Sequence, residues 1–270
     1  MALNTSPLRE ITQEDIDTYN RDGAVCIRKV LNQEWVDILL EQAREVIVEK
    51  KDVGLLPTIP GRYMARCLPD YRKLMFEGPV AEAAGKVLQS KEIRFFFDEF
   101  FAKPPQSDAA TLWHCDRMAF PVEGKLVPFP TADELEFSEP GDMLVVHPWV
   151  LHYSAGNPTD DWRVAISERV FGDDIRWAPR PDCLNIAGVS FDEMLDGEKP
   201  EGPLFPLLWS QDGRKEDDSE YPRGFATRWP KRDMGGVNEY DTFKKMKEKE
   251  DAGELSVSEK SPDHKKVGAH

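Results

Sequence analysis

From residue 91 onward the chain changes from helical periodicity to strict alternation, and this change most constrains its fold. Ile93, Phe95 and Phe97 occupy every second position, which is the period of a half-buried β-strand. Pro140-Gly141-Asp142 predicts a tight turn before another strand. Further strands are expected at residues 112–116, 135–137, 143–147 and 163–171. The sequence therefore predicts a mainly β protein.

The preceding residues carry helical patterns. Thr12 and Asp15 have the spacing of a capping box, and Gly23 is a helix-ending residue. Asn32 begins a longer helix whose apolar residues share one face: Trp35, Ile38, Leu39, Val46 and Ile47. A strand at 24–27 and a helix at 80–88 are also expected. These elements predict N-terminal helices packed against the sheet.

We expect one domain over residues 1–230 and a charged, disordered tail at 231–270, where large apolar residues are scarce. Within the domain we expect a helical layer at 10–90, a β core at 91–177 and an irregular C-terminal wrap, rich in proline and glycine, at 178–230.

Composition excludes several classes of partner. The net charge of −15 argues against nucleic acid and anionic membranes, which need clustered lysine and arginine. No run of eighteen apolar residues is present, so no membrane span is expected. The N-terminus is polar and the four cysteines are widely spaced, which favours a cytoplasmic protein with reduced thiols.

His114, Asp116 and His152 are candidate metal ligands. Two histidines and one carboxylate form the facial triad that holds Fe(II) and leaves coordination positions open. On a strand at 112–116, His114 and Asp116 project from the same face, whereas Cys115 points to the other face and is expected to pack. His147 competes with His152 for the second histidine position.

The residues after His152 extend the pattern. We expect His152 to begin a strand, with Ser154 on the same face. Arg163 follows eleven residues after His152. A guanidinium there could bind a carboxylate through two parallel hydrogen bonds.

With these residues in place, the chain resembles the phytanoyl-CoA dioxygenase family of Fe(II)- and 2-oxoglutarate-dependent oxygenases. The resemblance covers most of residues 10–210. Its motifs are the Asp22-Gly23 turn, Ala102-Lys103-Pro104-Pro105, Trp113-His114-Cys115-Asp116, Glu139-Pro140-Gly141-Asp142, His147-Pro148, His152-Tyr153-Ser154, Arg163 and Phe171-Gly172-Asp173-Asp174. Each motif is weak alone, and their combination is specific.

The resemblance implies a double-stranded β-helix, or cupin-like jelly roll, with iron on His114, Asp116 and His152, which favours His152 over His147. It implies that Arg163, assisted by the Ser154 hydroxyl, binds 2-oxoglutarate, and that O2 is the second co-substrate. The implied activity is hydroxylation or another oxidation of a small organic molecule in specialised metabolism, with 2-oxoglutarate decarboxylated to succinate and CO2.

The chain departs from the family between the two halves of the motif. Family members place two or three strands there, including one with a tryptophan, whereas here only residues 117–151 intervene. The jelly roll could therefore lack some core strands, and a dimer, homo- or heteromeric, would cover the exposed edges. A compact active enzyme, an auxiliary subunit that supports a partner protein and an altered gene product all stay open.

Overall fold

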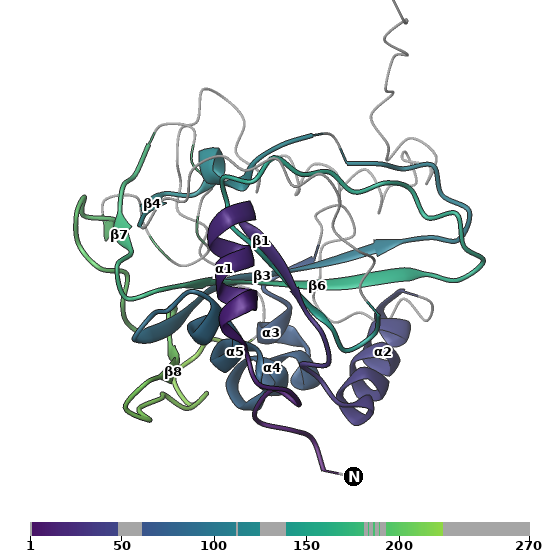
Figure 1. Ribbon diagram of the computed structural model, residues 1–270, viewed down its shortest axis with the longest axis horizontal. Helices are drawn as coiled ribbons and strands as arrows, with labels where there is room; N and C mark the ends of the chain where they lie inside the picture. The colour runs from purple at the N-terminus through teal and green to yellow at the C-terminus, as the bar shows by residue number, and fades with distance from the viewer. Residues whose placement is uncertain are drawn as a thin grey trace, which may run out of the picture.

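The computed structural model describes residues 2–47, 61–111, 113–124, 139–180, 183, 186, 189 and 193–223. Within them the protein is mainly β, with antiparallel sheets and helices contributed by the N-terminal half (Figure 1). No described helix combines the length and apolar character needed to cross a bilayer.

A central sheet is built on two long antiparallel strands, β3 (Glu92–Lys103) and β6 (Arg163–Phe171). They pair from Arg94 opposite Phe171 to Lys103 opposite Arg163. The short β2 (Gly61–Arg62) and β8 (Leu207–Ser210) also pair with β3. The strand predicted at 163–171 is confirmed.

A β-bulge at Phe96 changes the predicted alternation. The register passes from Phe95 opposite Val170 directly to Phe97 opposite Arg169, so Phe96 is the extra residue. Bulged strands reverse the facing of all later side chains. The prediction that Phe97 shares a face with Ile93 and Phe95 is therefore wrong, because Phe97 packs with Phe96 in a separate cluster.

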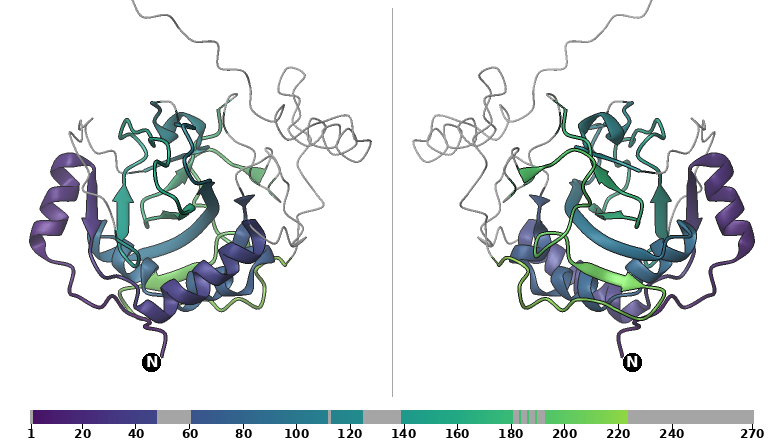
Figure 2. Two further views of the ribbon diagram at one scale, coloured as in Figure 1. Left: turned by 90° about the vertical axis from the view of Figure 1, so that its right-hand side faces the viewer. Right: turned by 90° about the vertical axis from the view of Figure 1, so that its left-hand side faces the viewer.

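The later helices cover one face of this sheet and the smaller sheets lie on its other side, whereas the first helix packs on β1 (Ala24–Ile27) (Figures 1 and 2). The helices are α1 (Gln13–Asp22), α2 (Gln33–Ile47), α3 (Met64–Cys67), α4 (Pro69–Glu77) and α5 (Val80–Val87). The predicted capping box of Thr12 and Asp15 is present, and Gly23 ends α1 with φ of 69°. Helices α3 and α4 were not predicted; α4 starts with proline, which is well suited to a first helical position.

Two small antiparallel sheets complete the fold. Strand β1 (Ala24–Ile27) pairs with β5 (Met143–Val146), and β4 (Val122–Glu123) pairs with β7 (Arg176–Trp177). The predicted turn before β5 is held to the N-terminal segment, because Asp142 forms an ion pair with Arg28 at 2.7 Å.

Several sequence predictions need correction or fall outside the described residues. Residues 113–116 form no strand, because His114 makes only an isolated bridge and Asp116 begins a 3-10 helix. The predicted irregular wrap contains β8, whose apolar residues pack on the sheet. The strand expected at 135–137 and the tail at 231–270 lie outside the described residues.

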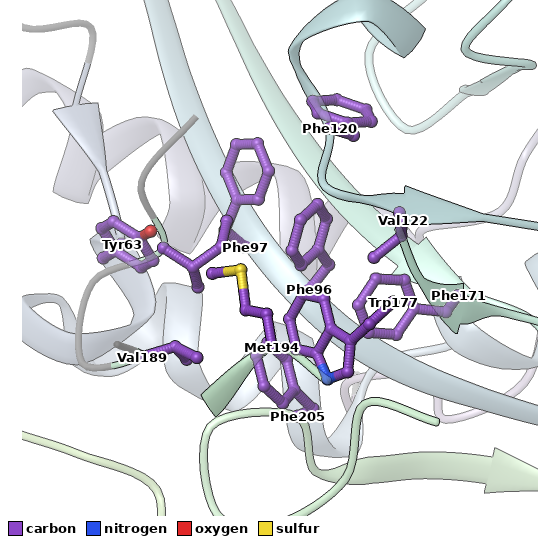
Figure 3. Close-up of a cluster of buried hydrophobic side chains, with 11 residues drawn as sticks. Tyr63, Phe96, Phe97, Phe120, Val122, Phe171, Trp177, Val189, Met194 and Phe205 are labelled. Atoms are coloured by element: carbon purple, nitrogen blue, oxygen red, sulfur yellow. The ribbon is translucent and has the colours of Figure 1, made fainter. Parts of the chain in front are cut away.

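An aromatic core fills the side of the sheet opposite the helices (Figure 3). Phe96 is its centre, with its ring 4.6 Å from that of Phe171 and 5.6 Å from that of Phe120. Trp177 and Phe205 close the cluster at 5.4 Å. Because Phe120 and Phe97 belong to the same cluster, the core supports the segment that carries Asp116.

Two acids are buried on the helix face, at Asp98 opposite Glu168 in the β3–β6 register. Asp98 accepts a 2.7 Å hydrogen bond from the Ala65 backbone in α3. Glu168 is half-buried as a residue, but its Oε2 is out of contact with solvent and has no hydrogen-bond partner among the described residues. Burial, together with the charge of Asp98, raises the pKa of Glu168 to about 8, and burial raises the pKa of Asp98 to about 6.

Substituting Glu168→Gln should reduce the loss of stability at alkaline pH. A folded state with raised carboxyl pKa values binds more protons than the unfolded chain, so stability falls as pH rises through the two raised values. Between pH 5 and pH 8 to 9, the free energy of unfolding should therefore fall more in the wild type than in the variant. The two falls should differ by on the order of 1 kcal/mol or more. Urea unfolding across pH 5 to 9 measures this, with Glu77→Gln as an exposed control; parallel pH profiles would contradict it.

Candidate metal centre

The two candidate histidines lie on neighbouring segments that run antiparallel to each other. His114 and His152 form a bridge in which each backbone N–H donates to the other residue's carbonyl, at 3.0 and 2.9 Å. Thr111 N–H donates to the Ser154 carbonyl at 2.9 Å. A second bridge joins Ser107 to Asn157. This ladder fixes both histidines on one face, since directly opposed residues project together.

Asn157 anchors the end of this ladder. Its side chain is 1% exposed and its Nδ2 donates to the carbonyls of Lys103, Pro104 and Asp161. The neighbouring Gly156 has no room for a side chain, because a Cβ there would lie 2.3 Å from the Ser107 carbonyl oxygen. The segment that carries His152 is therefore fixed to the end of β3.

Asp116 reaches the histidines from the first position of a 3-10 helix, η1 (Asp116–Ala119). The next residue, Arg117, fixes this helix in place. Its backbone N–H donates to the Pro148 carbonyl at 3.0 Å, and its buried guanidinium pairs with Glu123 at 2.7 Å. The sequence argument for a shared strand face was wrong, but the tight turn brings the carboxylate to the same point.

The three side chains converge. Asp116 Oδ1 lies 3.6 Å from His114 Nε2 and 3.9 Å from His152 Nε2. One ligand atom from each residue lies within 4.8 Å of the other two. Ligand atoms about 2.1 Å from one ion and at right angles to each other are about 3 Å apart, so the two carboxylate-to-imidazole distances need to contract by less than about 1 Å.

The protonation of His152 suits a metal ligand. Its Nδ1 lies 2.9 Å from the Val150 carbonyl oxygen. A carbonyl can only accept, so Nδ1 carries the proton of this hydrogen bond, which leaves Nε2, on the side of Asp116, as the nitrogen that would bind a metal. Two imidazoles and one carboxylate, with solvent access at 46% of the His114 side chain, fit a divalent transition-metal ion with open positions.

Arg169 of β6 contacts the outer oxygen of the carboxylate. Its Nη2 donates to Asp116 Oδ2 at 3.3 Å and pairs with the buried Glu99 at 2.6 Å. Neither Arg169 nor Glu99 was identified from the sequence. Counting in twos along β6 from Arg163 would have placed Arg169 on the same face as Arg163.

Arg163 and Lys103 lie opposite each other at the end of the central sheet. Lys103 Nζ donates to the carbonyls of Ser154 and Ala155 at 2.8 and 2.6 Å, and Arg163 Nη1 donates to the Ala155 carbonyl at 3.4 Å. Partial burial, and then the charge of Arg163, lower the pKa of Lys103. The structure thus brings Arg163 and Ser154 into one region, together with Lys103, which was not predicted as a site residue from the sequence.

His147 and Cys115, the other candidates in the sequence, do not join the three ligands. His147 is buried against α1, with its ring 6.4 Å from that of Tyr19. Its Nδ1 accepts a hydrogen bond from the Trp149 backbone at 3.3 Å. Among the described residues, the group that could hold a metal ion contains His114, Asp116 and His152 without Cys115.

Known structures show which fold surrounds this centre. No protein-family model matches the chain, and no curated protein matches it in sequence. The non-heme α-ketoglutarate-dependent carbocyclase SnoK from nogalamycin biosynthesis is similar over 76% of this chain and 100% of its own, with a TM-score of 0.56 and 17% identity. The epimerase SnoN, in complex with Fe3+, α-ketoglutarate and nogalamycin RO, has a TM-score of 0.56 and 20% identity over 73% of this chain and 98% of its own.

A third similar structure is the nickel complex of the non-heme monooxygenase ThoJ, with a TM-score of 0.54 and 13% identity over 89% of this chain and 99% of that protein. At these identities the similarities establish the fold alone. The protein shares the fold of the non-heme, α-ketoglutarate-dependent enzymes SnoK and SnoN.

Replacing His152 by alanine should abolish tight binding of Mn(II), used as a redox-stable probe. The loss in affinity should exceed the roughly 10- to 100-fold that loss of a hydrogen bond to a ligand costs. His147→Ala is the matched control, because it removes a more buried histidine that lies outside the cluster. Titration followed by the electron paramagnetic resonance of free Mn(II) measures both; equal affinities for the two variants would contradict the assignment.

Proposed function

We propose that the protein is a non-heme Fe(II)- and 2-oxoglutarate-dependent oxygenase that oxidises a small organic molecule. The observation that carries this proposal is the convergence of His114, Asp116 and His152, with His152 Nε2 directed at the cluster. The similar structures support the reaction class, because their printed descriptions name α-ketoglutarate-dependent enzymes on the same fold.

The three residues would hold the ion on one face and leave the opposite positions for co-substrates. Bound iron would supply the oxidising chemistry, in which 2-oxoglutarate, O2 and a substrate C–H bond give succinate, CO2 and a hydroxylated product. One oxygen atom enters succinate and the other enters the product. The protein's part is to orient the ligands and to bind the co-substrate.

Arg163 is the proposed partner of the distal 2-oxoglutarate carboxylate, with the Ser154 hydroxyl as a second donor. Ala155, whose carbonyl Arg163 contacts, is three residues from His152 and therefore within about 10 Å along an extended chain. Lys103 adds a second positive charge at the same place. In a protein with a net charge of −15, two cationic side chains thus lie together where a dicarboxylate would bind.

The jelly roll that the resemblance implies is also a proposal. Of the segment between Asp116 and His152, the described residues provide β4 and β5, and residues 125–138 lie outside the description. An auxiliary role, in which the same fold supports a partner protein without turnover, is the alternative that direct assay separates.

Purified protein supplied with Fe(II), 2-oxoglutarate and O2 should form succinate and CO2, and chelation of the metal should stop it. Substituting Arg163→Met should raise the KM for 2-oxoglutarate about 10-fold or more, since hydrogen bonds to charged groups contribute about 1.5 to 3 kcal/mol, while Mn(II) affinity stays unchanged. Succinate formation measures the activity.

Arg176→Met is the matched control, because Arg176 is an exposed arginine that donates to carbonyls of its own loop. Metal binding without succinate formation would reject the enzyme and favour the auxiliary role. An unchanged KM in the Arg163 variant would reject the co-substrate assignment alone.

A further inference from the structure

We infer that Arg169 is a positioning residue for the metal centre, which holds Asp116 as a one-oxygen ligand by binding its other oxygen. The inference rests on the proposed function, since it takes Asp116 to be a metal ligand. It concerns the described contacts of Arg169 with Asp116, Glu99 and Ser167.

The two carboxylate oxygens of Asp116 face different partners. Oδ1 is the oxygen nearest both imidazoles, at 3.6 and 3.9 Å. Oδ2 accepts from Arg169 Nη2 at 3.3 Å. Two imidazoles and one carboxylate oxygen occupy three coordination positions, whereas a carboxylate that binds through both oxygens would occupy a further one. Engaging Oδ2 therefore keeps a position open for co-substrate.

Arg169 is itself fixed from several sides. Its Nη2 pairs with the buried Glu99 at 2.6 Å, and its Nη1 donates to Ser167 Oγ at 2.9 Å. The guanidinium lies over the Phe97 ring at 4.9 Å and the Phe120 ring at 5.7 Å. A guanidinium held in this way can orient a flexible carboxylate, because its own position is set by β3 and β6.

The charges decide between a positioning role and a purely electrostatic one. A lone cation next to a metal site would weaken metal binding, yet Glu99 pairs with Arg169 and offsets its charge. Because the charges of Glu99 and Arg169 cancel, the main effect of the pair on a bound ion is to orient the Asp116 carboxylate. Loss of the pair should therefore weaken metal binding, the opposite of what removal of a repulsive cation would do.

The test compares Mn(II) affinity in the full-length wild type, Arg169→Met and the double variant Glu99→Gln/Arg169→Met. The double variant removes both charges, so Glu99 is not left buried and uncompensated. We expect the dissociation constant for Mn(II) to rise about 10- to 100-fold in both, the range found when a ligand's hydrogen-bond partner is lost. The free Mn(II) resonance reports binding without any need for turnover.

Arg94→Met is the control for a structural effect. Arg94 is a buried arginine of β3 that donates to the Phe205 carbonyl and lies 3.5 Å from Glu216. We expect this variant to lower the melting temperature and to leave Mn(II) affinity unchanged. Equal or tighter binding in the double variant would overturn the role of Arg169. Absence of Mn(II) binding by the wild type would instead overturn the proposed function, and this inference with it.

Discussion

The antiparallel pairing of β3 with β6 determines which of their side chains face the helices and which face the candidate metal centre. Side chains opposite each other in the ladder share a face, so one strand pair presents acids to the helices and charged residues to the candidate centre. Asp98 and Glu168 form a pair on the helix face, and Phe97 and Arg169 on the other. The bulge at Phe96 sets which residues take which face.

Two glutamates at adjacent positions in this ladder, Glu168 and Glu99, differ in how their charge is compensated. Among the described residues, Glu168 Oε2 has no hydrogen-bond partner, and its raised pKa means that Glu168 loses its charge more readily than an exposed glutamate. Glu99 is buried as well, but it keeps a guanidinium at 2.6 Å. Burying an ion pair brings little net stability. The Glu99–Arg169 pair is therefore better explained by the contact of Arg169 with Asp116 than by a gain in stability.

Local sequence signals identified the elements that depend on local physics. The capping box at Thr12, the turn at Gly141 and the strand from Arg163 to Phe171 follow from short-range patterns, and the structure contains all three. The face of Phe97 could not be predicted, because a bulge depends on the partner strand. The strand predicted at Asp116 was wrong for a similar reason. The 3-10 turn there is fixed by the hydrogen bond from Arg117 to Pro148, a contact between distant residues that periodicity does not reveal.

The difference between local signals and contacts between distant strands also applies to the candidate metal centre. The ligand types could be proposed from residue identity, whereas the contacts of Arg169 with Glu99 and Asp116 depend on the register of β3 with β6 and on η1. Lys103 was not predicted as a site residue, because nothing near it in the sequence indicates that it lies opposite Arg163. Groups that support a ligand come from strands distant in sequence.

The short segment between Asp116 and His152 bears on the enclosure of the centre more than on its geometry. The His114–His152 bridge, the Arg117 contacts with Pro148 and Glu123, and the Arg169–Asp116 hydrogen bond all lie within the described residues. None of them involves residues 125–138. Within the described residues, the ladder, η1 and β6 place the three side chains of the candidate centre. In the proposed enzyme, a short segment would alter the shielding of the ion from water, and hence the efficiency of oxidation.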